Sequence, residues 1–474
     1  MTMVLNPEDV KYLQKRQRDD TGRVFSWNGR IFRGIFPRQA EHVKTMFSNG
    51  FIRELITRKY FPETSITDYQ MEGFSIILEH KRIWPVLYPQ EWTFSMLKDA
   101  ALMVCRTAII AKRYGYNMRD CHGLNVLFDG ANPQFIDLGS FIPDIYLGWN
   151  PYEEFLRFYY YPLRIWQYNN FVGKLSIFSG NLTLHENYWK YQHPLLRRIN
   201  TGLLNRWINW YLRPSQLGCY SFTDLNALTG LNRLLGRLIR KRVISPESVN
   251  LEKLIRKIDS LSQIKTSSYW ESYHEDVKEK ADRFGRIIEI INSLDGEVRS
   301  AVDFGGNQGK FSRQMLDQTG LKEVACVDSD ENAVNTGYLS GGNSDKGKIT
   351  FAHYDFMGGI VKLRFTPPNE RFQADLVVAL ALTHHLTLAQ GYDIDEVFRY
   401  ISGYAKKYVL IEFMPLGLWV KGRQPNTPEW YTSAWFRKAF AKFFDLVLEE
   451  KLRENNVIFV GKVRPASKEN PANA

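Results

Sequence analysis

Residues 300–328 constrain the fold of this chain more than any other segment. An apolar run, Ser300–Phe304, leads into the glycine-rich stretch Gly305–Gly309, and a second apolar run, Glu323–Val327, ends beside Asp328. This order describes a strand–helix–strand unit with parallel strands. Similar runs follow at Ile349–His353, Ala374–Ala381, Tyr408–Phe413 and Val457–Val463. The alternation predicts an α/β fold whose C-terminal part is a Rossmann-like, doubly wound parallel sheet.

The chain has 474 residues and is too long for one ordinary hydrophobic core. Short strand-like runs mix with helical patterns before residue 145, a mainly helical and aromatic zone follows, and the polar stretch Asp259–Ser268 is a candidate linker. We therefore expect four parts: an α+β segment 1–145, its helical, aromatic and basic extension 146–268, the doubly wound domain 269–466 and a disordered tail 467–474.

Positive charge is concentrated in one part of the chain. The net charge is +11, and segment 188–257 holds thirteen Lys and Arg against three Asp and Glu. Arginines lie between leucines at helical spacing over Leu231–Arg242, which suits an anionic membrane surface or a phosphorylated substrate. The alternative is an ordinary amphipathic helix with a solvated basic face. No nucleic-acid-binding motif accompanies the charge, so we expect no nucleic-acid partner. The oligomeric state stays open.

The sequence carries no pattern typical of export. Its first residues show no basic stretch followed by an apolar core, and its four cysteines lie far apart. The most apolar helical run, Met96–Ala111, is too short and too charged to span a bilayer. We expect a cytoplasmic protein, with the inner membrane surface as an alternative location through segment 188–257.

The carboxyl ends of the strand-like runs carry a candidate ligand site. Ligands of open α/β sheets bind beyond these ends, and glycines without a Cβ let the chain pass close under a ligand. An acid before the glycine turn can accept from an ammonium group, and an acid after the second strand can accept from both ribose hydroxyls. This pattern favours S-adenosylmethionine (SAM) over NAD. The candidate binding residues are Asp303, Gly305, Gly306, Asn307, Gly309, Asp328 and, for the adenine amino group, Asp355.

Two other nucleotide-binding motifs fit the turn less well. Gly305–Lys310 is one residue shorter than a Walker A motif, and Phe311 stands where that motif has a magnesium-binding Ser or Thr. The glycines follow the pattern G-G-x-x-G, which differs from the dinucleotide pattern G-x-G-x-x-G.

The next two strand ends are expected to face the methyl acceptor. His384 and His385 follow the fourth run, and Glu412 lies in the fifth. Methyl transfer mainly needs an aligned and desolvated acceptor, and an oxygen acceptor also benefits from a base near neutral pH. His385, His384 and Glu412 are therefore the catalytic candidates, with a histidine as base and Glu412 orienting it. One alternative is that one ring packs under the cofactor and the other bonds a backbone carbonyl. Another is that the two histidines and the carboxylate hold a metal.

Residues 295–463 resemble a class I SAM-dependent methyltransferase. The resemblance rests on Asp303–Gly309, Asp328 and Leu380–Leu386. It implies that SAM is the cofactor and that the glycine turn, Asp328 and Asp355 bind it.

A second motif lies in the N-terminal part. Asp120-Cys-His-Gly-Leu-Asn125 precedes Phe135-Ile-Asp137-Leu-Gly139, and a helical run over about 94–114 comes before both. This arrangement resembles the catalytic and metal segments of the protein-kinase-like fold, which implies Asp120 as base and Asn125 and Asp137 as ligands of Mg²⁺ with ATP. No G-x-G-x-x-G occurs in residues 20–36, and no lysine stands in a V-A-I-K type of strand. Two interpretations of Asp120, Asn125 and Asp137 stay open: they catalyse phosphotransfer, or they only hold the loop together.

Most of the chain resembles a group of bacterial methyltransferases with a kinase-like N-terminal part that includes nodulation-associated proteins. The resemblance rests on the kinase-like segment 120–139, on Ile77–Ile83 and Tyr88–Trp92, and on the C-terminal domain. The resemblance leaves the acceptor open. We expect O-methylation of a carbohydrate or other small hydroxylated molecule, in polysaccharide modification, with the N-terminal domain helping to bind the acceptor. The alternatives are a bifunctional kinase–methyltransferase acting on a glycan end and a non-catalytic SAM-binding scaffold. The aromatic run Phe155–Trp166 is expected to fill core between helices rather than to stack on sugars.

Overall fold

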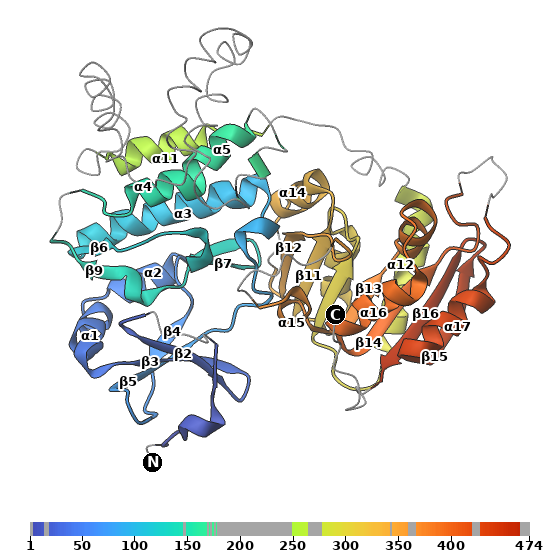
Figure 1. Cartoon of the computed structure of the whole chain (residues 1–474), viewed down its shortest axis with the longest axis horizontal. Coiled ribbons are helices and arrows are strands. Elements are labelled where there is room, and N and C mark those ends of the chain that lie inside the picture. The colour runs from blue at the N-terminus through green and yellow to red at the C-terminus, as the bar shows by residue number, and fades with distance from the viewer. Residues whose placement is uncertain are drawn as a thin grey trace, which may run out of the picture.

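The structure is a computed structural model that describes residues 3–13, 19–145, 148–167, 170, 173, 174, 177, 249–263, 277–341, 344–358, 366–419 and 427–464. Two large sheets organise the described part, one in each half of the chain (Figure 1). Segment 264–268 of the predicted linker, most of the basic segment 188–257, and the tail 467–474 lie outside the described residues.

The N-terminal half contains a five-stranded antiparallel sheet in the order β1-β2-β3-β5-β4. Its strands are β1 (Lys11–Tyr12), β2 (Gly22–Trp27), β3 (Arg30–Ile35), β4 (Thr64–Ile66) and β5 (Ile76–His80). β2 and β3 form a hairpin because Asn28 and Gly29 take positive φ angles of 49° and 75°, as a two-residue loop between twisted strands requires. The helices α1 (Ala40–Ser48) and α2 (Phe51–Thr57) connect β3 to β4.

The long helix α3 (Phe94–Arg113) follows, in close agreement with the helix predicted over about 94–114. α11 (Leu251–Asp259) packs along it (Figure 1). The strand pairs β6 (Tyr116–Met118) with β9 (Phe141–Pro143) and β7 (Val126–Asp129) with β8 (Asn132–Phe135) come next in the chain. The loop with Asp120 and Asn125 connects β6 to β7, and its Gly123 lies against Pro89 and Trp92, just before the first residue of α3.

A short helical segment completes the N-terminal half. It consists of α4 (Tyr152–Phe155), a π-helical turn at Leu156–Tyr160 and α5 (Tyr161–Trp166). Phe155, Tyr159 and Trp166 are fully buried, which confirms the core role predicted for this aromatic run.

The C-terminal half is a seven-stranded sheet in the order β12-β11-β10-β13-β14-β16-β15. Its strands are β10 (Ser300–Phe304), β11 (Glu323–Asp328), β12 (Lys348–His353), β13 (Ala374–Ala379), β14 (Ala405–Phe413), β15 (Phe444–Arg453) and β16 (Asn456–Val463). β10 to β14 are parallel, which confirms a doubly wound sheet. β16 runs antiparallel to both neighbours, so the prediction of a purely parallel sheet is wrong at this edge.

The sequence pattern does not predict the edge strand β15. Leu446 and Val447 are 43% and 49% exposed there, and no alternation of buried and exposed residues marks the strand. Pairing with β16 forms β15, because an edge strand needs only one neighbour.

Helices cover both faces of this sheet. They are α12 (Val277–Asn292), α13 (Lys310–Gln318), α14 (Glu331–Leu339), α15 (Pro368–Arg371), α16 (Ile394–Tyr404) and α17 (Ser433–Phe443), with a π-helical turn at His385–Ala389. Because parallel crossovers are right-handed, α13 and α14 cover one face and α15 and α16 the other. The chain leaves β10 towards β11 on one side and returns to β13 on the other, so the switch point lies at the carboxyl end of β10.

The two halves share a polar interface. Glu331 and Asn335 of α14 accept hydrogen bonds from the backbone N–H groups of Phe94 and Ser95, at 3.0 and 3.1 Å. Tyr338 donates to Asp99 at 2.7 Å. These contacts fix the N-terminal end of α3 against α14, next to the switch point. Among the described helices, none is long and apolar enough to cross a membrane.

Candidate functional site

A pocket of about 180 Å³ lies at the switch point of the C-terminal sheet. It is lined by Arg283, Phe284, Asp303, Gly305, Gly306, Asn307, Phe311, Val327, Asp328, Ser329, Tyr354, Asp355, Phe356, Leu380, Ala381, Leu382, His385, Leu386 and Gln390. The pocket therefore brings together all but one of the predicted cofactor residues, together with His385. Gly309, His384 and Glu412 are not part of its lining.

The glycine turn between β10 and α13 forms the floor of this pocket. Gly305 and Gly309 adopt positive φ angles of 71° and 74°, which only glycine takes without strain. A Cβ on Gly306 would lie 2.6 Å from Cys326 Sγ and 3.0 Å from Asp303 Oδ2. The turn is thus packed closely from below, and no side chain rises from its two leading glycines into the pocket.

Asp303 ends β10 beneath the turn and is only 2% exposed. Burial, with a smaller contribution from the charge of Asp328, raises the pKa of its carboxyl group to about 7. Ser312 Oγ donates to its Oδ2 at 2.6 Å. The carboxylate keeps further lone pairs, so a cationic ligand group in the pocket could use them and favour the ionised form.

Asp328 ends the neighbouring strand β11. Its two carboxylate oxygens accept from the backbone N–H groups of Asn307 and Asp330, each at 2.8 Å. These bonds fix the carboxylate at the pocket wall and leave acceptor capacity on both oxygens. Burial raises the pKa of Asp328. Two adjacent ligand hydroxyls could bind such a fixed, partly desolvated carboxylate bidentately.

Asp355 follows β12 on the same side of the pocket as Asp328 and is exposed. Its Oδ1 accepts from the N–H of Met357 at 2.9 Å. Phe356 stacks on Phe304 with 4.3 Å between the ring centroids. This end of the pocket therefore combines an acid with an aromatic wall, which suits a flat ring bearing an amino group.

The histidine pair occupies the end of β13. The rings of His384 and His385 lie 4.0 Å apart, and only His385 lines the pocket. His384 is 3% exposed, and burial lowers its pKa to about 3. Burial also lowers the pKa of His385, so this ring is neutral at physiological pH and able to accept a proton.

Glu412 does not orient a histidine, and that expectation is wrong. Its buried carboxylate accepts from the N–H of Ala381 and from Asn456 Nδ2, each at 2.7 Å, and pairs with Arg283 at 3.3 Å. Ala381 has a positive φ of 49°. Glu412 therefore holds the turn after β13 and the guanidinium that faces the pocket.

The sequence patterns missed several pocket residues. Arg283 and Phe284 come from α12, which precedes the first strand of the sheet, and Gln390 follows the π-helical turn. None of the three lies in a local motif, so only tertiary packing brings them to the pocket.

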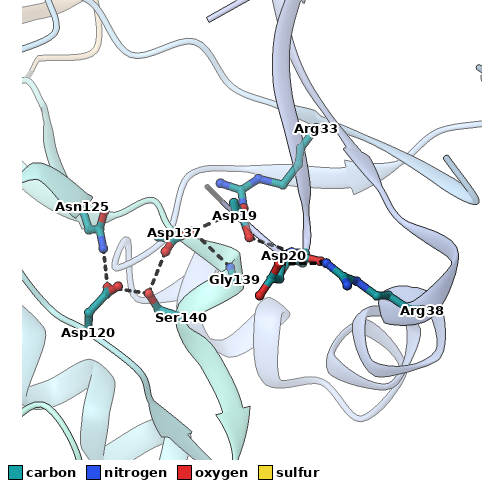
Figure 2. A network of polar contacts seen from close by, with 10 residues as sticks. Asp19, Asp20, Arg33, Arg38, Asp120, Asn125, Asp137, Gly139 and Ser140 are labelled. Carbon is teal, nitrogen blue, oxygen red and sulfur yellow. Dashed lines mark hydrogen bonds and ion pairs between the residues drawn. The ribbon is translucent and has the colours of Figure 1, made fainter. Parts of the chain in front are cut away.

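The N-terminal trio forms a second polar cluster (Figure 2). Asn125 Nδ2 donates to Asp120 Oδ1 at 2.6 Å, and Ser140 Oγ lies 2.7 Å from both Asp120 Oδ1 and Asp137 Oδ2. The structure thus brings together the three residues that the motif singles out, with Ser140 bridging the two acids. No group of three or more His, Cys, Asp or Glu side chains suited to a metal occurs within the described ranges.

A buried arginine of β3 completes this cluster. Arg33 Nη1 bonds Asp19 Oδ2 at 2.9 Å and Asp137 Oδ1 at 3.3 Å, and the Arg33 side chain is 7% exposed. Figure 2 shows Arg33 reaching from β3 towards Asp19, which precedes β2, and towards Asp137. A cation bound to Asp137 would therefore compete with a guanidinium that is already in place. No local sequence pattern marks Arg33.

Comparison with known proteins gives one relative over most of the chain. The chain is 25% identical over 433 residues to the nodulation protein NoeA of Rhizobium meliloti, and the alignment covers 84% of each protein. No known family model matches the chain.

Solved methyltransferase structures are similar to part of the chain. The N-methyltransferase NodS of Bradyrhizobium japonicum WM9 shows 10% identity and a TM-score of 0.30, over 40% of this chain and 99% of NodS. The magnesium protoporphyrin IX methyltransferase ChlM of Synechocystis PCC 6803 shows 14% identity and a TM-score of 0.28, over 50% of this chain and 100% of ChlM.

Proposed function

We propose that this protein is a SAM-dependent methyltransferase whose donor binds at the switch point of the C-terminal sheet. The observation that carries the proposal is the convergence of Asp303, the Gly305–Gly306 turn and Asp328 in one pocket. SAM presents an ammonium group, a ribose diol and an adenine amino group, and the pocket offers an acid for each in Asp303, Asp328 and Asp355. The turn can pass close under the ligand because Gly305 and Gly306 carry no side chain.

The pocket also provides what an acceptor needs. When bound, SAM would supply an electrophilic methyl group. An incoming acceptor atom would attack that carbon in line with the C–S bond, which breaks as S-adenosylhomocysteine leaves. Leu380, Leu382 and Leu386 line the acceptor side and exclude water, while His385, neutral at pH 7, can take the proton of an attacking hydroxyl. An oxygen acceptor uses such a base most, so we propose a small hydroxylated molecule or glycan as the acceptor class. The similarity to a nodulation protein leaves its identity open.

Titration calorimetry with S-adenosylhomocysteine (SAH) tests this function. We expect the wild-type protein to bind SAH, and Asp328→Ala to bind it roughly 100-fold more weakly, because two hydrogen bonds to a charged group are lost. Asp445→Ala, which removes an exposed carboxylate paired with Arg464, is the matched control and should bind as the wild type does. Absence of wild-type binding, or equal affinity in Asp328→Ala, would contradict the proposal.

The N-terminal cluster supports a second candidate, a bifunctional kinase–methyltransferase. The observation that favours it is the contact of Asp120, Asn125 and Asp137 through hydrogen bonds and Ser140. The Arg33–Asp137 ion pair weighs against it, because a bound Mg²⁺ would have to share or displace the guanidinium. Magnesium-dependent ATP binding that is lost in Asp137→Asn would support this candidate, and the absence of ATP binding in the wild type would exclude it.

A further inference from the structure

Arg283 places a positive charge on the wall of the donor pocket. It projects from α12, lines the pocket beside Phe284, and its side chain is 13% exposed. Phe284 packs on Phe311 of α13 at 4.8 Å, which anchors this part of α12 beside the glycine turn. The cation is therefore a fixed feature of the pocket rather than a mobile surface side chain.

The guanidinium of Arg283 has more donors than its protein partner uses. Of its five N–H groups, only those on Nη1 meet an acceptor among the described residues, Glu412, at 3.3 and 3.4 Å. These distances exceed the 2.7–2.9 Å usual for charge-assisted bonds. Nε is buried and has no hydrogen-bond partner in the described part of the chain. Buried donors of a charged group are costly to leave unmade, so an anionic ligand group would satisfy them.

The charges of the pocket follow the strand order. Asp328 ends β11, Asp355 follows β12, and Asp303 lies in the central β10. Arg283 pairs with Glu412 of β14. A ligand that spans the pocket thus meets two acids at one end, then Asp303, and then the guanidinium of Arg283. An α-amino acid group matches the last two, since its ammonium suits Asp303 and its carboxylate suits Arg283.

We propose that Arg283 binds the carboxylate of the amino-acid portion of the donor, opposite Asp303. This inference rests on the proposed function. Glu412 is then a positioning residue, which holds the guanidinium from behind through Nη1 and leaves its other edge to the ligand. The arrangement selects a donor that carries an intact amino-acid end.

Paired titrations with SAH and 5′-methylthioadenosine test the inference, since the second ligand has the adenosine but lacks the amino-acid group. Arg283→Gln should weaken SAH binding roughly 10- to 100-fold and leave the affinity for 5′-methylthioadenosine unchanged within about twofold. Arg286→Gln, one turn further along α12 in an exposed pair with Glu450, should leave both affinities unchanged. Arg283→Gln alone leaves the buried carboxylate of Glu412 without its cation, which could lower affinity by destabilising the fold. The double variant Arg283→Gln/Glu412→Gln removes that carboxylate, and it is compared with Glu412→Gln alone.

Each outcome bears on the inference. A selective loss of SAH affinity in both backgrounds supports it. Unchanged SAH affinity overturns the inference and would assign Arg283 to the acceptor instead. An equal loss of affinity for both ligands overturns it too, and would assign Arg283 a structural role. Failure of the wild type to bind either ligand contradicts the proposed function itself and the inference with it.

Discussion

Gly306 has no room for a side chain. A methyl group there would meet Cys326 Sγ at 2.6 Å, and this sulfur is buried under the turn. Gly306→Ala should lower the free energy of unfolding by about 1–3 kcal/mol, as overpacking of a filled core does. Gly320→Ala is the control, because a Cβ at Gly320 meets nothing within 4 Å. Equal stability of the two variants in urea unfolding would show that the turn is looser than described.

Asp303 should make ligand binding depend on pH. With its pKa near 7, the carboxyl is mostly protonated at pH 6 and mostly ionised at pH 8, and only the ionised form pairs with a ligand ammonium. Affinity for SAH should therefore rise from pH 6 to pH 8, by up to about tenfold per pH unit below the pKa. Asp303→Asn should bind more weakly and lose this dependence. The same slope in Asp303→Asn would assign the titration to another group.

His385 should shape the pH profile of methyl transfer. Burial lowers the pKa of His385 below 6.5. The rate should therefore rise with pH up to this lowered pKa and stay level at higher pH. His385→Gln should remove the rise and lower the rate about 10²- to 10⁴-fold, as loss of a general base does. The measurement is conversion of SAM to SAH with an acceptor-containing extract of the producing cells. Loss of the rise in His384→Gln instead would assign the base to its neighbour.

Some residues of the site lie in a local sequence motif, and others reach the pocket only through tertiary packing. Asp303, Asp328 and the glycines could be predicted, because strand ends and a turn place them at one edge wherever the sheet forms. Arg283 could not, since α12 reaches the pocket only after the helix packs on α13. The role expected for Glu412 was wrong for a similar reason: its partners Ala381, Asn456 and Arg283 come from three other segments.

At the scale of elements, α3 depends on α14 for its N-terminal cap. Thr93 accepts from the N–H of Met96, while the N–H groups of Phe94 and Ser95 bond Glu331 and Asn335. A helix leaves its first N–H groups without partners inside the helix, so side chains of another element complete this end. Glu331 is also the first residue of the helix that follows Asp328. The ligand site and the N-terminal half are therefore connected over a few residues.

Removal of this cap should be measurable. Glu331→Ala should lower the free energy of unfolding by about 1–2 kcal/mol and speed hydrogen exchange at the N–H of Phe94. Glu252→Ala, in the first turn of α11, is the control, because Glu252 is exposed and its helix is capped by Asn250. Unchanged exchange at Phe94 would show that α14 does not cap α3 in solution.

Elements marked by their own periodicity were predictable. α3 and the strands β10 to β14 agree with their predicted ranges within a few residues, because each is a buried run bounded by polar or glycine residues. β15 and the antiparallel direction of β16 were not predictable, since strand direction depends on the partner strand and β15 exposes its apolar residues.

At the scale of the whole molecule, a buried ion pair joins the halves. Arg371 Nη2 and Nη1 lie 2.5 and 2.8 Å from the carboxylate of Glu91, and the two side chains are 4% and 7% exposed. Arg371→Ala should cost about 3–5 kcal/mol of stability, because it leaves Glu91 buried and unpaired. Arg437→Ala, which removes an exposed pair with Glu449, should cost at most about 1 kcal/mol. Similar unfolding temperatures for the two variants would contradict a fixed junction between the halves.

We place the donor at the switch point of the C-terminal sheet, and a crystal structure of the protein with bound SAH would test this placement. We expect the adenosyl group across the carboxyl ends of β10 and β11, its ribose hydroxyls on Asp328 and its sulfur directed towards His385. SAH bound elsewhere on the protein would contradict this placement. So would a pocket filled by the chain itself, with Asp303 and Asp328 facing away from it.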